Sequence, residues 1–182
     1  MYPRFKQAKT TQLACEFLRL AGGRMSYMKL IKLLYLVDRR SLLERGVPVT
    51  YDRYVSMSHG PVLSETLDLI NYGSGPSEES YWETHVDQDS RYEVSLKGDC
   101  PLDELSDAEV DLARAVYAEF GKMDRWAVVE RLHQLPEWRD PGEVRVLPIR
   151  YEDILAHEKT PDESEQIIDD LRAMGAAEAI FG

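Results

Sequence analysis

Apolar residues recur three or four positions apart in several segments of the chain, which is the spacing of one face of an α-helix. In the first of these segments Leu13, Phe17 and Leu18 share a face, and a glycine pair at residues 22–23 then supplies a left-handed stop. The pattern predicts helices over residues 6–21, 27–44, 61–72, 107–120 and 125–135, and a last helix from residue 161 to at least 174.

The second of these segments is apolar on nearly all sides. It begins after Ser26, a common N-cap residue, and ends before Gly46. A helix without a broad polar face is normally enclosed by other elements, so we expect residues 27–44 to form the central core helix. Its core positions are expected at Leu30, Leu33, Leu34 and Tyr35.

Other segments predict strands. Residues 47–49 and 51–57 are rich in valine, threonine and tyrosine, which favour extended structure. Apolar and polar residues alternate over 82–86 and again over 92–96, on either side of a polar turn, and this pattern predicts an antiparallel hairpin. A short apolar run follows at 144–149.

Between the extended run and the third helix lie His59, Gly60 and Pro61. Glycine permits unusual backbone dihedrals, and proline presets the first turn of a helix. We therefore expect Gly60 and Pro61 to form a strand-to-helix turn. Pro61 would open the helix, with Glu65 near its positive end, and a serine-rich loop over 74–80 would follow it.

Capping residues mark the later helices. Ser106 with Glu109 and Thr160 with Glu163 form capping boxes, and Asp124 is an N-cap candidate. Together with the strands, these elements predict a mainly α-helical α+β fold: a single compact helical domain with a small antiparallel β-hairpin or sheet.

Length and composition agree with one domain. The 182 residues include 43% apolar residues, enough to close a core. We expect the domain to cover residues 1–158 and a C-terminal helical extension to cover 159–182.

Charge is divided unevenly along the chain. The net charge is −11, yet residues 1–60 carry 11 basic and four acidic residues, which leaves 11 basic and 29 acidic residues in the remainder. An acidic surface disfavours DNA as the main partner, because phosphate binding depends on concentrated positive charge.

The two cysteines, Cys15 and Cys100, form neither a disulfide framework nor a zinc motif, which fits a reducing compartment. Cys15 is expected to be a buried apolar residue, whereas Cys100 precedes Pro101 in a loop that could leave it exposed. No leader-like segment or membrane-length apolar run is present, so we expect a cytoplasmic protein.

The sequence contains no pattern typical of an active site. The histidines are not spaced as metal ligands, and no glycine-rich phosphate loop is present. His85, Glu83 and Asp87 would share one strand face, which we expect to be a solvated polar surface. We predict no catalytic residue, no cofactor and no metal ion.

A helix, two glycines, a second helix and a later hairpin are also typical of a winged-helix DNA-binding protein. The helix that would enter the DNA groove, however, is the most apolar segment of the chain, and a recognition helix needs a polar face. Its basic residues do not form a broad one; they are Lys29, Lys32, Arg39 and Arg40.

Three segments carry a specific combination of residues: residues 28–36 (MKLIKLLYL), residues 55–62 (VSMSHGPV), and His133 with the Pro-Glu-Trp at 136–138. In this order they resemble the Panacea domain of SocA-like antitoxins and phage-associated proteins. The resemblance spans roughly residues 8–155 and departs at His59, where the family usually has an aromatic residue. Its main residues are Lys29, Leu30, Leu33, Leu34, Tyr35, Gly60, Pro61, Val62, His133 and Trp138. We expect His133 and Trp138 to lock the end of the fifth helix against the core.

The resemblance implies a non-enzymatic antitoxin that neutralises a cognate protein toxin, encoded nearby, by direct protein–protein binding. A proteolytic adaptor that delivers the toxin to a protease, and a DNA-binding transcriptional regulator, are the alternatives. An acidic antitoxin favours a basic toxin, because complementary charge accelerates encounter. Aromatic residues near turns are common interface anchors. The predicted contact residues are Tyr51, Tyr54, His59, Trp82 and Tyr92.

Overall fold

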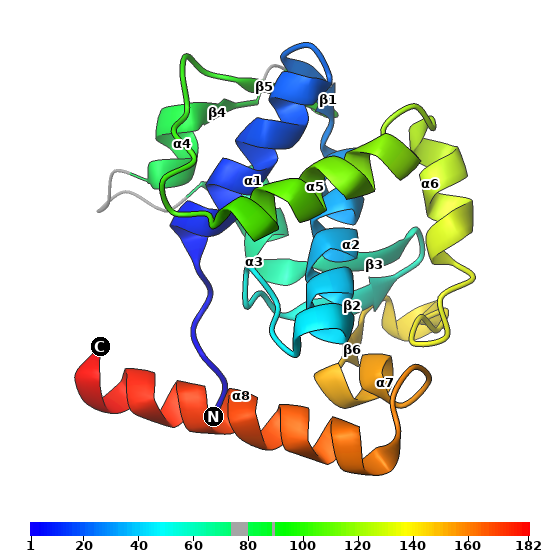
Figure 1. Cartoon of the computed structure of the whole chain (residues 1–182). Helices are drawn as coiled ribbons and strands as arrows, with labels where there is room; N and C mark the ends of the chain where they lie inside the picture. The colour runs from blue at the N-terminus through cyan, green and yellow to red at the C-terminus, as the bar shows by residue number, and fades with distance from the viewer. Residues whose placement is uncertain (74–79, 89) are drawn as a thin grey trace.

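A computed structural model describes residues 1–73, 80–88 and 90–182. It confirms the expected fold class, since helices dominate and the strands form two small antiparallel sheets (Figure 1). The helices are α1 (Gln7–Leu20), α2 (Tyr27–Arg45), α3 (Ser64–Tyr72), α4 (Tyr81–His85), α5 (Asp107–Phe120), α6 (Arg125–Leu132), α7 (Tyr151–Leu155) and α8 (Pro161–Phe181), with a 3-10 turn at Gly142–Val144. No helix in the described ranges is long and apolar enough to cross a membrane.

Helix α2 runs through the middle of the molecule and contacts α1, α5, α6, α7 and strand β3 (Gly60–Leu63) (Figure 1). The core positions expected on it are fully buried, which confirms the prediction of a central core helix. The helix ends at Gly46, whose φ of 73° lies in the left-handed region that glycine enters without steric cost. The buried core positions are Leu30, Leu33, Leu34 and Tyr35.

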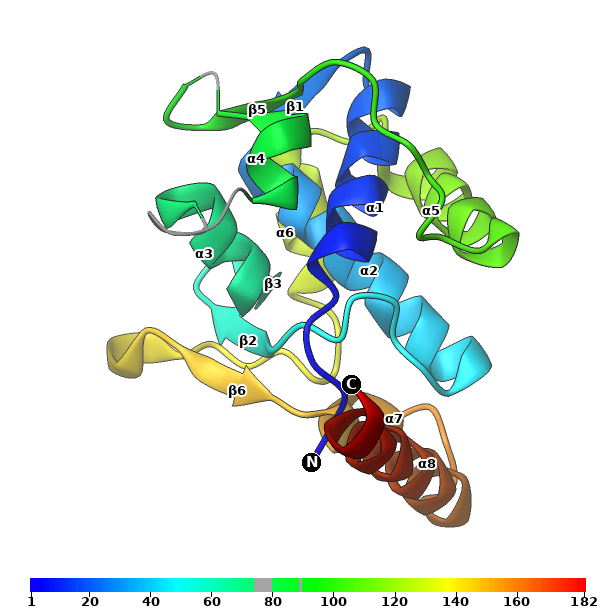
Figure 2. The same ribbon diagram turned by 90° about the vertical axis from the view of Figure 1, so that its left-hand side faces the viewer.

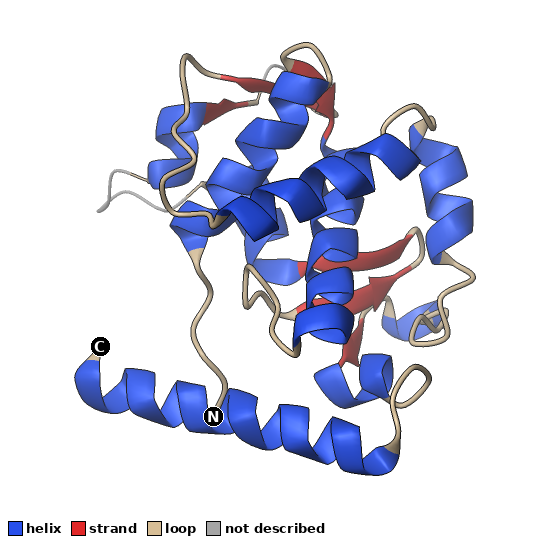
Figure 3. Cartoon of the chain, viewed as in Figure 1, coloured by secondary structure: helices blue, strands red, loops and turns tan. Residues whose placement is uncertain are grey.

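The strands form two separate three-stranded sheets (Figure 3). One sheet has the order β1-β5-β4, and the other has the order β3-β2-β6, with β2 in the middle. Their bounds are β1 (Arg24–Ser26), β2 (Tyr54–Met57), β3 (Gly60–Leu63), β4 (Val86–Asp87), β5 (Glu93–Leu96) and β6 (Leu147–Ile149). The sequence pattern did not predict β1, because three residues are too few to show an alternation.

The prediction that Pro61 opens the third helix is wrong. Pro61 lies in β3, opposite Ser56 of β2, and α3 begins three residues later at Ser64. Because β3 is an edge strand, it is a position in a sheet where proline is tolerated. The N-terminus of α3 is capped by Asp52, whose carboxylate accepts hydrogen bonds from the backbone N–H groups of Glu65 and Thr66 at 2.8 and 2.9 Å.

The predicted strand over 82–86 is also wrong, because most of it forms the short helix α4. Trp82 and Val86, which suggested alternation, lie four residues apart, and this spacing suits a helical turn equally well. Glu83 and His85 lie on α4, so the strand face expected to carry them with Asp87 does not form. The hairpin survives as the short β4–β5 pair. Most of the loop predicted at 74–80, and residue 89 of the predicted turn, lie outside the described residues.

The predicted caps of the later helices are confirmed, whereas Ser26 precedes α2 without a side-chain capping hydrogen bond. Ser106 and Thr160 each form a capping box, and Asp124 accepts hydrogen bonds from the first turn of α6. Helix α8 then lies at one edge of the molecule, and the N-terminal segment runs from α1 down to it (Figures 1 and 2). Ile168 and Leu171 are its large buried apolar side chains.

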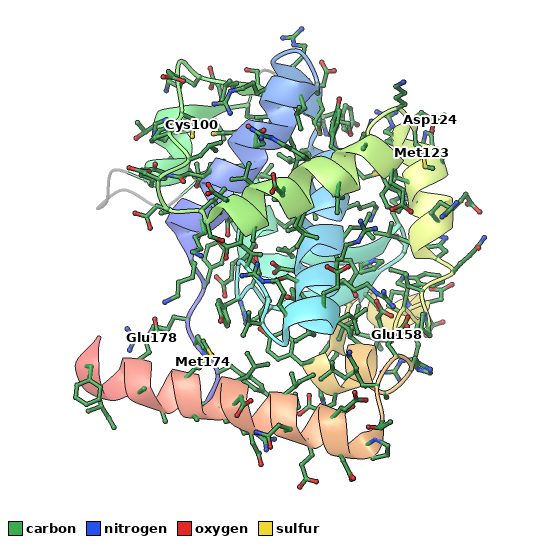
Figure 4. The ribbon with its side chains drawn as sticks, in the orientation of Figure 1. Cys100, Met123, Asp124, Glu158, Met174 and Glu178 are labelled. Carbon is green, nitrogen blue, oxygen red and sulfur yellow. The ribbon has the colours of Figure 1, made fainter. Side chains whose placement is uncertain are left out.

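The side chain of Glu178 ties α8 to the N-terminal segment. Its carboxylate accepts hydrogen bonds from the Lys6 ammonium at 2.5 Å and from the Arg4 backbone N–H at 3.0 Å (Figure 4). Gly175 also packs against the backbone of Met1 and Tyr2. The last helix therefore contacts the chain's first residues as well as α7.

Candidate functional site

The three sequence segments that resemble the Panacea domain meet at the turn between β2 and β3. The indole N–H of Trp138 donates to the carbonyl of Met57 at 3.0 Å, and His133 Nε2 lies 3.1 Å from the carbonyl oxygen of Ser58. The two rings stack on one another with centroids 4.0 Å apart. His133 and Trp138 therefore hold the β2–β3 turn in place, a more specific role than locking the end of α6.

A buried ion pair fastens the same region to α2. Glu137 is 4% exposed; its carboxylate accepts a hydrogen bond from the hydroxyl of Tyr35 at 2.7 Å and forms an ion pair with Arg39 at 2.7 Å. Burial raises the pKa of Tyr35, and the negative charge of Glu137 raises that pKa further. The phenol therefore stays protonated and remains a donor. Arg39 also reaches Glu158 at 3.2 Å; Figure 4 labels Glu158 close to α7.

Lys32 lies beneath the β2–β3 turn and is 1% exposed. Its ammonium donates to the carbonyl of Pro61 at 3.3 Å and forms no ion pair with any residue that the structure describes. Gly60 has a φ of +98°, and a Cβ there would lie 3.2 Å from Lys32 Nζ, so the turn approaches the ammonium closely. Burial without a compensating negative charge lowers the pKa of Lys32 to about 8.

A small cavity of about 110 Å³ opens beside Lys32. Apolar side chains from α2, β2, β3 and α3 form most of its wall, and His59 lies at the turn above it. We call it the Lys32 cavity. It is lined by Tyr27, Met28, Ile31, Lys32, Met57, Ser58, His59, Val62 and Leu67.

Next to this cavity the surface carries an exposed aromatic and basic cluster. The ring of His59 meets that of Trp126 edge to face at 5.4 Å, and the guanidinium of Arg125 lies 5.4 Å from the Trp126 ring centroid. Trp126 is 49% exposed although it is large and apolar. Both residues open α6 directly after its cap Asp124, which Figure 4 labels at the turn from α5. We call His59, Arg125 and Trp126 the turn surface.

The structure does not bring the predicted contact residues together. His59 is exposed on the β2–β3 turn, Tyr92 is 55% exposed beside the other sheet, and Tyr51 is partly buried. Tyr54 and Trp82 are each 3% exposed, and the Tyr54 hydroxyl donates to the buried carboxylate of Asp38 at 2.9 Å. Because both belong to the core, Tyr54 and Trp82 offer a partner almost no surface.

Sequence reasoning missed Trp126 and the burial of Lys32. Trp126 follows a helix cap, a place where the sequence alone does not show which way a side chain points. Lys32 lies in the segment that is apolar on nearly all sides. A lysine in such a helix has no polar face to occupy, and this position was the signal in the sequence that could have predicted its burial.

Cys100 is 2% exposed, so the expectation that it could be exposed is wrong, whereas Cys15 is fully buried as expected. Among the described residues no group of three or more histidine, cysteine or carboxylate side chains could hold a metal ion.

Another cavity, of about 560 Å³, lies between the N-terminal segment, the β2–β6 edge, α7 and α8. Tyr2, Tyr51 and Tyr151 contribute to its lining. Two of its guanidinium groups already have carboxylate partners, because Arg53 pairs with Glu65 at 2.8 Å and Arg172 with Glu152 at 3.7 Å. These charged groups are therefore engaged within the fold.

Comparison with known proteins gives one result. The family described as antitoxin SocA-like, Panacea domain, matches residues 30–139. A search of curated proteins and a search of solved structures found no match. The matched range contains two of the three segments that meet at the β2–β3 turn and all but the first two residues of the third, and it covers more than half of the chain. This protein therefore belongs to the SocA-like antitoxin family with a Panacea domain.

Proposed function

We propose that this protein is an antitoxin that neutralises a cognate protein toxin by direct binding, without catalysing a reaction. Membership of the SocA-like family is the observation that carries the proposal. It is consistent with the engaged charged groups of the 560 Å³ cavity, where Arg53 and Arg172 already have carboxylate partners.

The turn surface is the proposed toxin contact. Tryptophan and arginine are enriched among residues that dominate binding energies, and here Trp126 and Arg125 lie side by side and exposed. His133 and Trp138 brace the turn beneath His59 through backbone carbonyls. A rigid surface loses less conformational entropy on binding, so this bracing favours affinity.

Charge favours a basic toxin. Exposed carboxylates lie along α8 and around the start of α5, and such a surface attracts a basic protein during encounter. They include Asp103, Glu104, Asp107, Asp111, Asp162, Glu163, Glu165, Asp169 and Asp170.

A protein partner is favoured over DNA by the position of α2. This helix would be the recognition helix of a winged-helix protein, yet its residues from Leu30 to Asp38 are all buried. A recognition helix must present side chains to the DNA groove. The adaptor alternative remains open to test, since an adaptor shortens the half-life of the toxin and a plain neutraliser does not.

Co-expression with the product of the neighbouring gene tests the proposal. We expect that product alone to arrest growth, and we expect this protein to restore growth and to co-purify with it. Failure of both rescue and co-purification would reject the antitoxin function. Pulse-chase measurement of the toxin's half-life then distinguishes an adaptor, which shortens the half-life, from a plain neutraliser. A mobility-shift assay at low salt with the promoter of this protein's gene tests DNA binding.

A further inference from the structure

Six charged side chains are buried in the described part of the molecule, and Lys32 differs from the other five. Glu16, Glu109 and Glu137 each form an ion pair with a basic residue. The carboxylates of Asp38 and Asp52 accept four and three hydrogen bonds, respectively. The Lys32 ammonium has three N–H donors, yet among the described residues it has one acceptor, the carbonyl of Pro61 at 3.3 Å, and no counter-charge.

We propose that the Lys32 cavity receives an aspartate or glutamate side chain of the partner protein, with the Lys32 ammonium as its counter-ion. The proposal rests on the proposed function, because it names the chemistry of one contact in the antitoxin–toxin interface. A buried cation without a partner is unfavourable, and a carboxylate from another chain would supply the missing charge and acceptors.

The size and lining of the cavity suit such an occupant. A volume of about 110 Å³ is well below the roughly 300–1,000 Å³ of sites for small molecules, so it admits one side chain. Met28, Ile31 and Val62 would contact the methylene groups of that side chain. Methionine side chains adapt readily to different contacts, which suits a protein-binding surface.

The cavity is continuous with the turn surface, because His59 belongs to both. A toxin that packs on Trp126 would therefore lie beside the opening. The acidic anchor is compatible with a toxin that is basic overall, since net charge acts on encounter at long range, whereas one buried ion pair acts only after docking.

The other reading of Lys32 is structural, in which its ammonium merely holds the turn through Pro61. The two readings differ in their consequences. A structural lysine is needed for stability, so replacing it would weaken the fold. A receptor lysine is needed for binding, so Lys32→Met would leave a folded protein that has lost affinity for its partner.

The test uses the full chain and the toxin encoded beside it. We expect Lys32→Met to weaken binding at least tenfold by calorimetry, because removing one member of a buried charge pair leaves the other unpaired. Lys122→Met, which removes an exposed lysine, is the matched control and should leave the affinity unchanged. Aspartate-to-asparagine and glutamate-to-glutamine substitutions across the toxin should identify one carboxylate whose loss weakens the wild-type complex but not the Lys32→Met complex. Unchanged affinity of Lys32→Met would overturn the proposal.

A second measurement does not depend on the toxin. Titration of the free protein with blocked glutamate (N-acetylglutamate methylamide), followed by NMR of lysine side-chain signals, should shift the Lys32 signal. Blocked glutamine, the neutral analogue of similar shape, should not. If the neighbouring gene product fails to bind at all, the proposed antitoxin function fails, but this titration still tests whether the Lys32 cavity binds a carboxylate. If the Lys32 signal does not shift at saturating blocked glutamate, the proposed carboxylate site is contradicted.

Discussion

Lys32 lies mostly among apolar side chains, and within the described part of the chain one carbonyl is the partner of its ammonium. Burial lowers its pKa from 10.5 to about 8, and each pKa unit corresponds to about 1.4 kcal/mol. The folded state therefore loses about 3 kcal/mol to this group near neutral pH. Proteins often retain such destabilising groups where function requires them.

Replacing Lys32 should therefore stabilise the fold. We expect Lys32→Met to raise the free energy of unfolding at pH 7 by about 1–3 kcal/mol, since methionine has a similar length and the lost hydrogen bond offsets part of the gain. The unfolded chain binds more protons than the folded chain between pH 8 and 10.5, so the penalty is complete below about pH 8 and disappears toward pH 10.5. Urea unfolding at several pH values measures this, and a destabilised variant at pH 7 would support the structural reading of Lys32.

Trp126 is the residue on which the proposed contact surface depends most. We expect Trp126→Ala to weaken toxin binding by about 2 kcal/mol or more, as is usual for a tryptophan anchor, while changing the free energy of unfolding by less than about 1 kcal/mol because the ring is half exposed. Tyr72→Ala provides the control: Tyr72 is 80% exposed at the end of α3 and should not affect binding. If both variants bind the toxin with equal affinity, the toxin contact does not lie on the turn surface.

At the scale of elements, contacts among the family segments join α2, the segment after α6 and the β2–β3 turn; we call these contacts the interlock. Tyr35 and Arg39 on α2 meet Glu137, which follows α6, and the neighbouring Trp138 bonds to the end of β2. The chain's most recognisable residues therefore connect elements about a hundred residues apart in sequence. They support the turn surface more than they form it.

Breaking this interlock should be costly. We expect Glu137→Gln to lower the free energy of unfolding by about 3 kcal/mol, because it leaves the guanidinium of Arg39 without its buried partner. Arg39 also pairs with Glu158, whose side chain is 47% exposed, so Glu158→Gln should cost no more than about 0.5 kcal/mol. Denaturant unfolding of both variants makes the comparison, and similar losses in the two would argue against an interlock.

At the scale of the whole molecule, we propose that residues 159–182 are an extension that stabilises a separately folding domain. Helix α8 buries Ile168 and Leu171 and pairs Glu178 with Lys6. It also carries Ile180 and Phe181 at its far end, 72% and 87% exposed.

A chain ending at residue 158 should still fold cooperatively. We expect its free energy of unfolding to fall by about 3 kcal/mol, because burial of each large apolar side chain contributes about 1.5–3 kcal/mol and the entropy of ordering α8 offsets part of this. A chain lacking only residues 180–182 is the control and should unfold as the full chain does. Circular dichroism during thermal unfolding distinguishes the two, and loss of the cooperative transition in the shorter chain would show that the domain needs α8.

The overall charge predicts how the complex forms. If the acidic surface attracts a basic toxin, raising the ionic strength should slow association by about tenfold or more and change dissociation less. Stopped-flow mixing at low and high salt measures both rates. An association rate independent of salt would contradict electrostatic attraction. It would not bear on the proposal that Trp126 contacts the toxin.

The sequence by itself determined the longer helices but not α4 or α7, and it determined most of the helix ends, the central position of α2 and the family. These depend on local signals: Ser106, Asp124 and Thr160 cap their own helices, and an apolar segment is buried whatever surrounds it. Only the tertiary structure decided that Pro61 lies in an edge strand and that Trp82 is buried in a helix. It also decided that Lys32 has no counter-charge among the described residues and that Trp126 is exposed. Those outcomes depend on which distant segments meet, because a residue's burial and its partners are set by packing rather than by its sequence neighbours.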